Sequence, residues 1–191
     1  MLPIIFVAKF LQLLPHLLRS DNDQHDPEEI LNNCIKLIIE AKDFVSNCLK
    51  IDLKNIKGFG LANQRETLVV WNKTTGKCIN RAIVWSDSRN RNTVEKILKI
   101  YNKSYFYKIN GLQISTYFTL FKILWLLNES NEIRKIYLND NLIFGTMDSW
   151  FVQNLSLEKN IFTDETNASR TFMMDLSRKN WSDEILEKFK I

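Results

Sequence analysis

The stretch that decides the fold reads GFGLANQRETLVVWNKTTGKC and spans Gly58–Cys78. Two apolar runs, residues 56–63 and 67–71, are rich in residues typical of strands and are separated only by Gln64, Arg65 and Glu66. The hydrophilic segment 72–77 that follows has the composition of a turn. The pattern predicts two short strands, with an arginine and a glutamate displayed in the connection between them, where loops often carry function.

Helical and strand-like segments alternate on both sides of this stretch. A polar linker ends in Asp26 and Pro27, which is typical of a helix start, and the apolar spacing then predicts a helix that closes near Lys50. Asp148 or Ser149 is the predicted cap of a helix after a buried strand, and Ser182 the predicted cap of the last helix. The alternation indicates the α/β class. Further strands are expected at 82–85, 142–146 and 169–176, and further helices at 93–100, 117–127, 132–138, 150–155 and 182–189.

Composition excludes several classes of function. The chain has 191 residues, of which 45% are hydrophobic and 25% charged, as in ordinary globular proteins. A net charge of +4 from interspersed residues is too weak a field for a charge-driven nucleic-acid binder. The three cysteines form no C-x-x-C spacing, which argues for free thiols in a reducing compartment, and two histidines argue against a zinc site. Asn63 stands where a dinucleotide fingerprint requires glycine.

The first residues form an apolar leader, MLPIIFVAKFLQLLPHLL. Lys9, Gln12, Pro15 and His16 interrupt it, so it lacks the uninterrupted apolar length of about 20 residues that spans a membrane. It also lacks the basic start and cleavage site of a secretory signal. We therefore expect a docked or amphipathic segment, or a truncated or mispredicted start, in preference to a targeting signal. The expected location is cytoplasmic, with association with mitochondria as an alternative.

The pair Arg65 and Glu66 is the first candidate binding site. Neighbouring residues of a straight strand point to opposite faces, so both side chains reach one ligand only if the chain turns there. A guanidinium offers only donors and an ionised carboxylate only acceptors, and together they match the hydroxyls of a polyol or sugar. The alternative is a solvated hairpin whose charges have no ligand.

Two aromatic residues and three aspartates are further candidates. Trp85 ends a strand-like run, where it either lines a polyol pocket or packs in the core, and Tyr117 stands near a helix start with the same two alternatives. The candidate bases are Asp87, Asp148 and Asp164, whose spacing defines no pair. No G-x-S-x-G elbow supports a hydrolase triad.

Five segments together resemble the N-terminal domain of the FGGY carbohydrate kinase family, in its glycerol kinase group. They are GFGLANQRETLVVWNKTTGK, AIVWSDSR, STYFTLFKILWLL, LIFGTMDSW and TDETNASRT. The likeness covers residues 25–191 and leaves 1–24 outside as leader and linker. It implies an incomplete ribonuclease H-like fold, related to actin and hexokinase, and the ATP- and Mg-dependent phosphorylation of glycerol to glycerol 3-phosphate. It also implies that Arg65, Glu66, Tyr117 and Trp85 contact glycerol or a similar small polyol.

The sequence departs from the family in two places. The family's first strand and its Asp-Gln-Gly-Thr phosphate loop are replaced by the leader, and its catalytic aspartate is expected beyond Ile191. We therefore assign no catalytic, cofactor-binding or metal-binding residue in this chain, and expect that the chain alone does not complete the reaction. The alternative is a non-catalytic kinase relic or interaction protein, which self-associates or binds an intact kinase subunit.

Overall fold

The computed structural model describes residues 23–191, so most of the predicted leader lies outside the described range. The described chain divides into two compact units. One contains Glu28–Leu61, and the other contains residues 23–27 together with Ala62–Ile191. Within the described residues, no helix is both long enough and apolar enough to cross a membrane.

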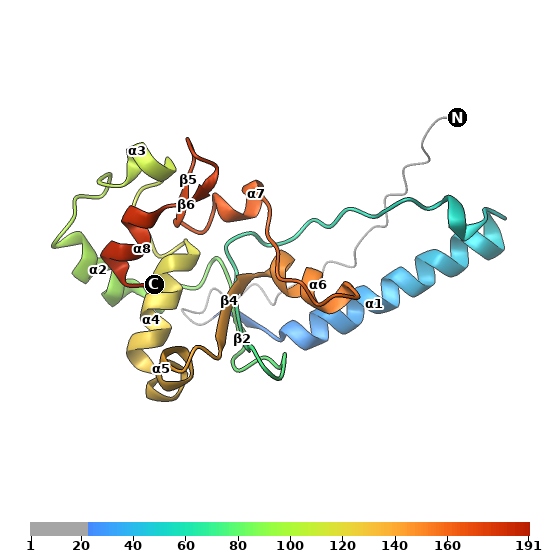
Figure 1. Ribbon diagram of the computed structural model, residues 1–191, viewed down its shortest axis with the longest axis horizontal. Helices are drawn as coiled ribbons and strands as arrows, with labels where there is room; N and C mark the ends of the chain where they lie inside the picture. Colours follow the sequence, from blue (N-terminus) through green and yellow to red (C-terminus); the bar gives the residue numbers. More distant parts are fainter. Residues whose placement is uncertain (1–22) are drawn as a thin grey trace. The chain divides into compact units, whose positions relative to one another are not determined.

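The first unit is helical (Figure 1). The helix α1 (Pro27–Asp43) begins at the predicted proline and continues as a π-helical turn, η1 (Phe44–Cys48), which ends near the predicted Lys50. Glu28 and Glu29 lie in its first turn and Lys42 in its last, the arrangement that complements the helix dipole. A short 3₁₀-helix, η2 (Leu53–Asn55), follows.

The second unit is built on a four-stranded antiparallel sheet. Its strands are β1 (Gln24–His25), β3 (Ala82–Ile83), β2 (Leu68–Asn72) and β4 (Leu142–Thr146), in that order across the sheet. The longest ladder joins β2 to β4, side by side in Figure 1, and pairs Leu68 with Thr146 at one end and Asn72 with Leu142 at the other. A second, two-stranded sheet pairs β5 (Met174–Asp175) with β6 (Asn180–Trp181).

The strand predicted at residues 56–63 is wrong. The structure assigns no strand there and pairs the segment with no ladder among the described residues. A strand is stabilised by its partner's hydrogen bonds, and Gly58 and Gly60 add the conformational entropy cost of glycine to an unpaired segment. The turn predicted after it is present, because Arg65 and Glu66 form a turn immediately before β2.

Helices pack around the sheet of the second unit. The prediction that Ser182 caps the last helix is confirmed, since its side chain accepts a hydrogen bond from the Ile185 amide. The predicted cap of the helix α6 (Met147–Leu155) is wrong, because Thr146 occupies the N-cap position and Asp148 lies in the first turn. Extended pairing holds β4 up to Thr146, so the helix begins two residues earlier than its polar residues indicated. The helices are α2 (Arg91–Leu98), α3 (Tyr107–Asn110), α4 (Thr119–Glu129), α5 (Asn131–Leu138), α6 (Met147–Leu155), α7 (Glu165–Ala168) and α8 (Asp183–Phe189).

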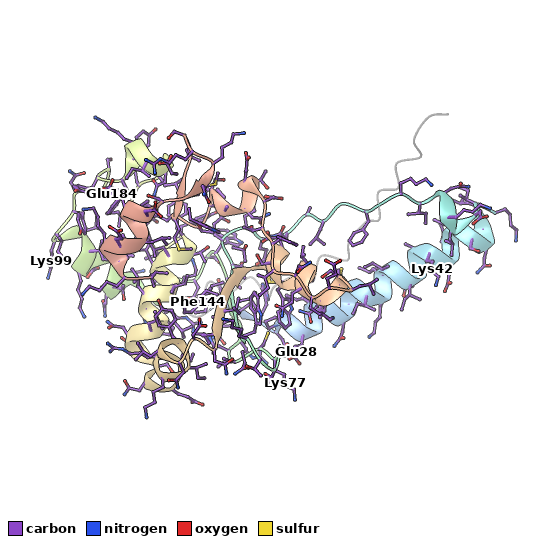
Figure 2. All side chains as sticks on the ribbon, in the orientation of Figure 1. Glu28, Lys42, Lys77, Lys99, Phe144 and Glu184 are labelled. Atoms are coloured by element: carbon purple, nitrogen blue, oxygen red, sulfur yellow. The ribbon has the colours of Figure 1, made fainter. Side chains whose placement is uncertain are left out.

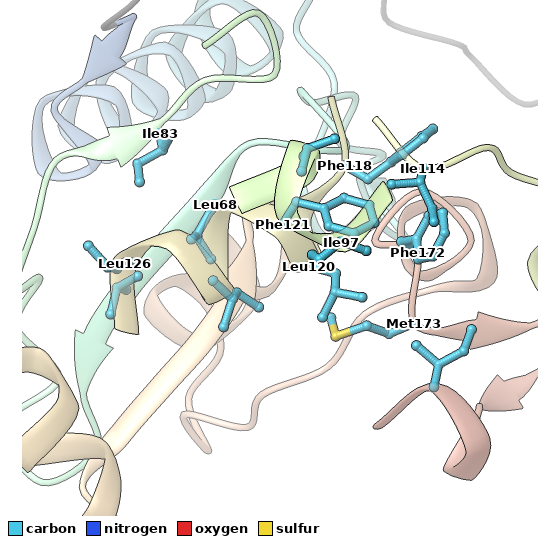
Figure 3. Packing of buried hydrophobic residues seen from close by; sticks show 14 of the residues in the cluster. Leu68, Ile83, Ile97, Ile114, Phe118, Leu120, Phe121, Leu126, Phe172 and Met173 are labelled. Carbon is cyan, nitrogen blue, oxygen red and sulfur yellow. The ribbon is translucent and has the colours of Figure 1, made fainter. Parts of the chain in front are cut away.

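The core of the second unit is aromatic and centres on α4 (Figure 3). Phe121 is fully buried, and its ring meets the ring of Phe172 edge to face with centroids 4.8 Å apart. Phe118 packs against the same Phe172 ring at 5.7 Å. Because Phe118 is buried in this cluster, it anchors the loop that precedes α4 in the core. Charged side chains such as Lys77, Lys99 and Glu184 are exposed on the outside of this unit (Figure 2).

Close packing at Gly145 gives a first prediction. A Cβ atom at this position would lie 2.7 Å from Cζ3 of the buried Trp71 ring and closer still to Cη2. Gly145→Ala should therefore lower the unfolding free energy by about 1–3 kcal/mol, the usual cost of overpacking a core. Chemical denaturation followed by circular dichroism measures this. Gly60→Ala is the control, because nothing lies within 4 Å of its Cβ position, and equal midpoints for the two variants would contradict the prediction.

Candidate functional site

A buried carboxylate lies at the centre of the candidate site. Glu66 is only 4% exposed, although it stands in the turn that leads into β2. Its Oε1 accepts a hydrogen bond of 2.6 Å from Nε of Arg170, which is 104 residues away in the sequence. Its backbone carbonyl accepts a 3.2 Å hydrogen bond from the Thr119 hydroxyl at the start of α4. The turn therefore presents an ionised carboxylate in a fixed position.

Arg170 joins this carboxylate to the predicted aromatic residues. The guanidinium carbon lies 5.6 Å from the centre of the Tyr117 ring and 5.1 Å from that of Phe118, within cation–π range. The Tyr117 ring in turn packs against Trp85 with centroids 5.5 Å apart. Trp85 is 43% exposed, so it is not the buried core tryptophan of the alternative interpretation. Glu66, Tyr117 and Trp85 are thus brought together, with Arg170 between the first two.

Arg65 occupies the same turn as Glu66 but is exposed. Its side chain has no hydrogen bond or ion pair to the rest of residues 23–191. The turn thus places a buried carboxylate and a solvated guanidinium next to each other in the chain.

The loop that carries Arg170 is held by a capped short helix. Asp164 is the N-cap of α7, and its Oδ1 accepts hydrogen bonds from the Thr166 hydroxyl at 2.7 Å and the Asn167 amide at 2.8 Å. These bonds, with that of Thr166 first, lower the pKa of the Asp164 carboxyl. Asn167 also accepts a 2.9 Å hydrogen bond from the Asn63 side chain. Asp164 is therefore a structural cap in this arrangement.

The two other candidate bases are also engaged in structural contacts. Asp87 is buried, and its two oxygens accept from Nε and Nη2 of Arg89 at 2.9 and 2.6 Å. Asp148 is buried as well and accepts a 2.7 Å hydrogen bond from the Thr163 hydroxyl. Each of these two carboxylates is therefore held by a contact within the protein, Asp87 by an ion pair and Asp148 by a hydroxyl.

A buried lysine lies beneath the site, and the sequence patterns did not single it out. Lys122 of α4 is fully buried, and its Nζ donates to the carbonyl oxygens of Tyr117 at 2.6 Å and Thr116 at 3.1 Å. Burial lowers its pKa to about 7, and the negative charges of Asp87 and Glu66 limit the decrease. The one feature of the sequence that could have pointed to Lys122 is that it is the only charged residue in the apolar run TLFKILWLL.

An open depression of about 580 Å³ adjoins this assembly. Tyr117, Phe118 and Arg170 are among its lining residues, whereas Arg65, Glu66 and Trp85 are not. Tyr117 and Arg170 therefore border a volume that admits a small molecule, and Arg170 also bonds to the buried carboxylate.

Comparison with known proteins identifies the family to which this domain belongs. Residues 9–191 match the FGGY family of carbohydrate kinases, N-terminal domain, and the chain belongs to this family. The match begins ahead of residue 25, where the resemblance found in the sequence begins, and so takes in part of the leader and linker.

Similar proteins include a glycerol kinase of Natranaerobius thermophilus, 37% identical over 180 residues, and a probable glycerol kinase of Caenorhabditis elegans, 36% identical over 183 residues. Each comparison covers 94% of this chain but 35% of the relative, so the chain spans about a third of their length. The crystal structure of Plasmodium falciparum glycerol kinase with ADP superposes with a TM-score of 0.78 and 34% identity, covering 91% of this chain and 34% of that one.

More distant structures confirm the fold alone. The gluconate kinase of Lactobacillus acidophilus shares 20% identity with a TM-score of 0.74, and covers 90% of this chain and 32% of the kinase. These neighbours are sugar kinases of the actin/hexokinase-like ATPase fold, and the mixed helices and sheets described here are a partial domain of it. The predicted fold class is therefore confirmed.

Within residues 23–191, no group of three or more His, Cys, Asp or Glu side chains is placed to hold a metal ion. The five glycines of the sequence also form no glycine-rich phosphate-binding loop. We therefore assign no particular residue of the described chain to binding ATP or a metal ion.

Arg170 gives the second prediction. Arg170→Lys keeps the charge but removes the planar fork that bonds Glu66 and covers Tyr117 and Phe118. For glycerol, the ligand proposed in the next section, we expect the dissociation constant measured by calorimetry to rise about fivefold, since roughly 1 kcal/mol of cation–π and hydrogen-bond energy is lost. Arg178→Lys is the control, because Arg178 is mostly exposed and pairs only with Asp175. An unchanged constant in Arg170→Lys would contradict the assigned role.

Proposed function

We propose that this chain forms the polyol-binding part of a glycerol kinase, an enzyme that transfers a phosphoryl group from ATP to a terminal hydroxyl of glycerol. The observation that carries the proposal is the buried carboxylate of Glu66, which bonds through Oε1 to Arg170, whose guanidinium lies over the Tyr117 ring that packs against Trp85. The bond to Arg170 uses Oε1, so Oε2 remains for a ligand hydroxyl.

Each predicted residue then has a distinct role. Glu66 accepts hydrogen bonds from glycerol hydroxyls, and Arg65, whose guanidinium has no partner in residues 23–191, donates to their oxygens. Trp85 and Tyr117 cover the carbon side of the ligand, as aromatic rings do in sites for small polar molecules. A small polyol offers little apolar area, so affinity depends on charged hydrogen-bonding partners, each contributing about 1.5–3 kcal/mol.

ATP supplies the phosphoryl group in this reaction, and in phosphoryl transfer catalysis consists mainly of positioning and charge stabilisation. The described residues position the acceptor, and we derive no step through the nucleotide or a metal ion from them. A cytoplasmic location, self-association and binding to an intact kinase subunit stay predictions.

Calorimetric titration of the chain with glycerol tests the proposal. We expect saturable binding at one site, and weaker binding of propane-1,2-diol, which lacks one terminal hydroxyl and leaves a charged partner unpaired. Absence of saturable heat with glycerol would refute the polyol site. Release of ADP in the presence of glycerol and ATP tests catalysis separately from binding.

A further inference from the structure

A buried cation connects three loops that carry the proposed site. Lys122 is 0% exposed, and such burial is rare for a lysine without strong partners. Its ammonium donates to the carbonyl of Tyr117 itself, at 2.6 Å, and to that of the preceding Thr116, at 3.1 Å. The Thr116 carbonyl also accepts a 3.0 Å hydrogen bond from the buried Asn90 side chain. The backbone that presents the Tyr117 ring is thus held from inside the unit.

The charges around Lys122 come from the other two loops. Glu66 lies in the turn before β2 and Asp87 in the loop after Trp85, and both interact electrostatically with the ammonium. Each carboxylate also pairs with an arginine, Glu66 with Arg170 and Asp87 with Arg89. The ammonium therefore completes a cluster of two negative and three positive groups, and every loop that bears a predicted ligand residue contributes to it.

We propose that Lys122 is a positioning residue of the polyol site, whose buried ammonium fixes the Tyr117 backbone against α4 and draws the Glu66 and Trp85 loops together. This inference rests on the proposed function. Lys122 does not touch the ligand in this account, and acts through Tyr117 and the two carboxylates.

The protonation state of Lys122 distinguishes this role from simple packing. The protonated amine donates charge-assisted hydrogen bonds to both carbonyls and attracts Asp87 and Glu66, whereas the neutral amine keeps only ordinary hydrogen bonds. Because burial lowers the pKa of Lys122 to about 7, the proton is bound at pH 6 and largely lost at pH 8.5. The charged groups around the ammonium are the carboxylates of Asp87 and Glu66, each of which is paired with an arginine. Glycerol should therefore bind more tightly at the lower pH.

The variant Lys122→Met removes the charge and keeps an unbranched apolar chain of similar length. We expect the wild-type dissociation constant for glycerol to rise roughly fivefold from pH 6 to pH 8.5, the ratio that separates charged from neutral hydrogen bonds. The variant should bind at least as weakly as the wild type at pH 8.5 and show no such pH dependence. Leu126→Ala, a buried change one helical turn from Lys122 that leaves the ammonium in place, should keep the wild-type pH profile.

A measurement on the unmodified chain covers the case in which Lys122→Met does not fold. Binding linkage is reciprocal, so glycerol should raise the pKa of the Lys122 ammonium, seen by NMR of lysine labelled with ¹³C at Cε. Glycerol binding with a flat pH profile and an unmoved Lys122 titration would overturn the inference and leave the polyol site standing. Absence of glycerol binding to the wild-type chain at either pH would overturn both.

Discussion

Glu66→Gln should weaken glycerol binding by roughly 10- to 100-fold, because it removes a charged acceptor from the ligand and also leaves the Arg170 guanidinium without its ion-pair partner. The amide keeps the size of the side chain but lacks the negative charge that pairs with Arg170. It also lacks the charged oxygens that accept hydrogen bonds from ligand hydroxyls. It also presents donor hydrogens to a ligand that needs an acceptor. Calorimetric titration at pH 7 measures the change, and circular dichroism checks that the variant is folded.

A surface carboxylate provides the matched control. Glu158 is exposed and accepts a hydrogen bond only from the exposed Asn160, so Glu158→Gln removes the same charge from the chain without touching the site. Its dissociation constant for glycerol should equal that of the wild type. Equal binding by Glu66→Gln and Glu158→Gln would mean that the buried carboxylate is a structural ion pair and not a ligand partner.

Phe121→Ala should lower the unfolding free energy by about 3–5 kcal/mol, the range for removing a fully buried phenylalanine. The Phe121 ring meets Phe172 at 4.8 Å and Phe189 at 6.2 Å, so its loss opens a cavity between α4, the segment after α7, and α8. Urea denaturation gives the value. Phe162→Ala removes an exposed ring and should change the unfolding free energy by less than about 0.5 kcal/mol. A small effect at Phe121 would show that the aromatic cluster does not hold the unit together.

The sequence predicted the helices and caps that depend only on neighbouring residues. The apolar spacing of residues 117–127 predicted α4. Ser182, a residue type preferred at helix starts, predicted the cap of α8. The strand at 56–63 was not predictable, since a strand exists only where another strand pairs with it. The start of α6 was displaced because the ladder between β2 and β4 continues to Thr146.

The residues of the site were predicted only where a local pattern or the family resemblance pointed to them. The predicted turn between the two apolar runs is present at Arg65 and Glu66. The resemblance to the kinase family named Trp85 and Tyr117, whose ring centroids lie 5.5 Å apart at an interplanar angle of 52°. Arg170 was missed because its ion pair with Glu66 spans 104 residues, which no local pattern encodes. Lys122 was missed because its partners are backbone carbonyls, which every sequence contains.

The central claim is that Arg65, Glu66, Tyr117 and Trp85 surround one glycerol molecule. A crystal structure of the chain grown with glycerol near its measured dissociation constant tests this most directly. The account predicts glycerol oxygens within hydrogen-bond distance of the Glu66 carboxylate and the Arg65 guanidinium, with the Trp85 and Tyr117 rings against its carbons. Glycerol bound elsewhere, with the bond between Glu66 and Arg170 enclosed by protein on all sides, would contradict it.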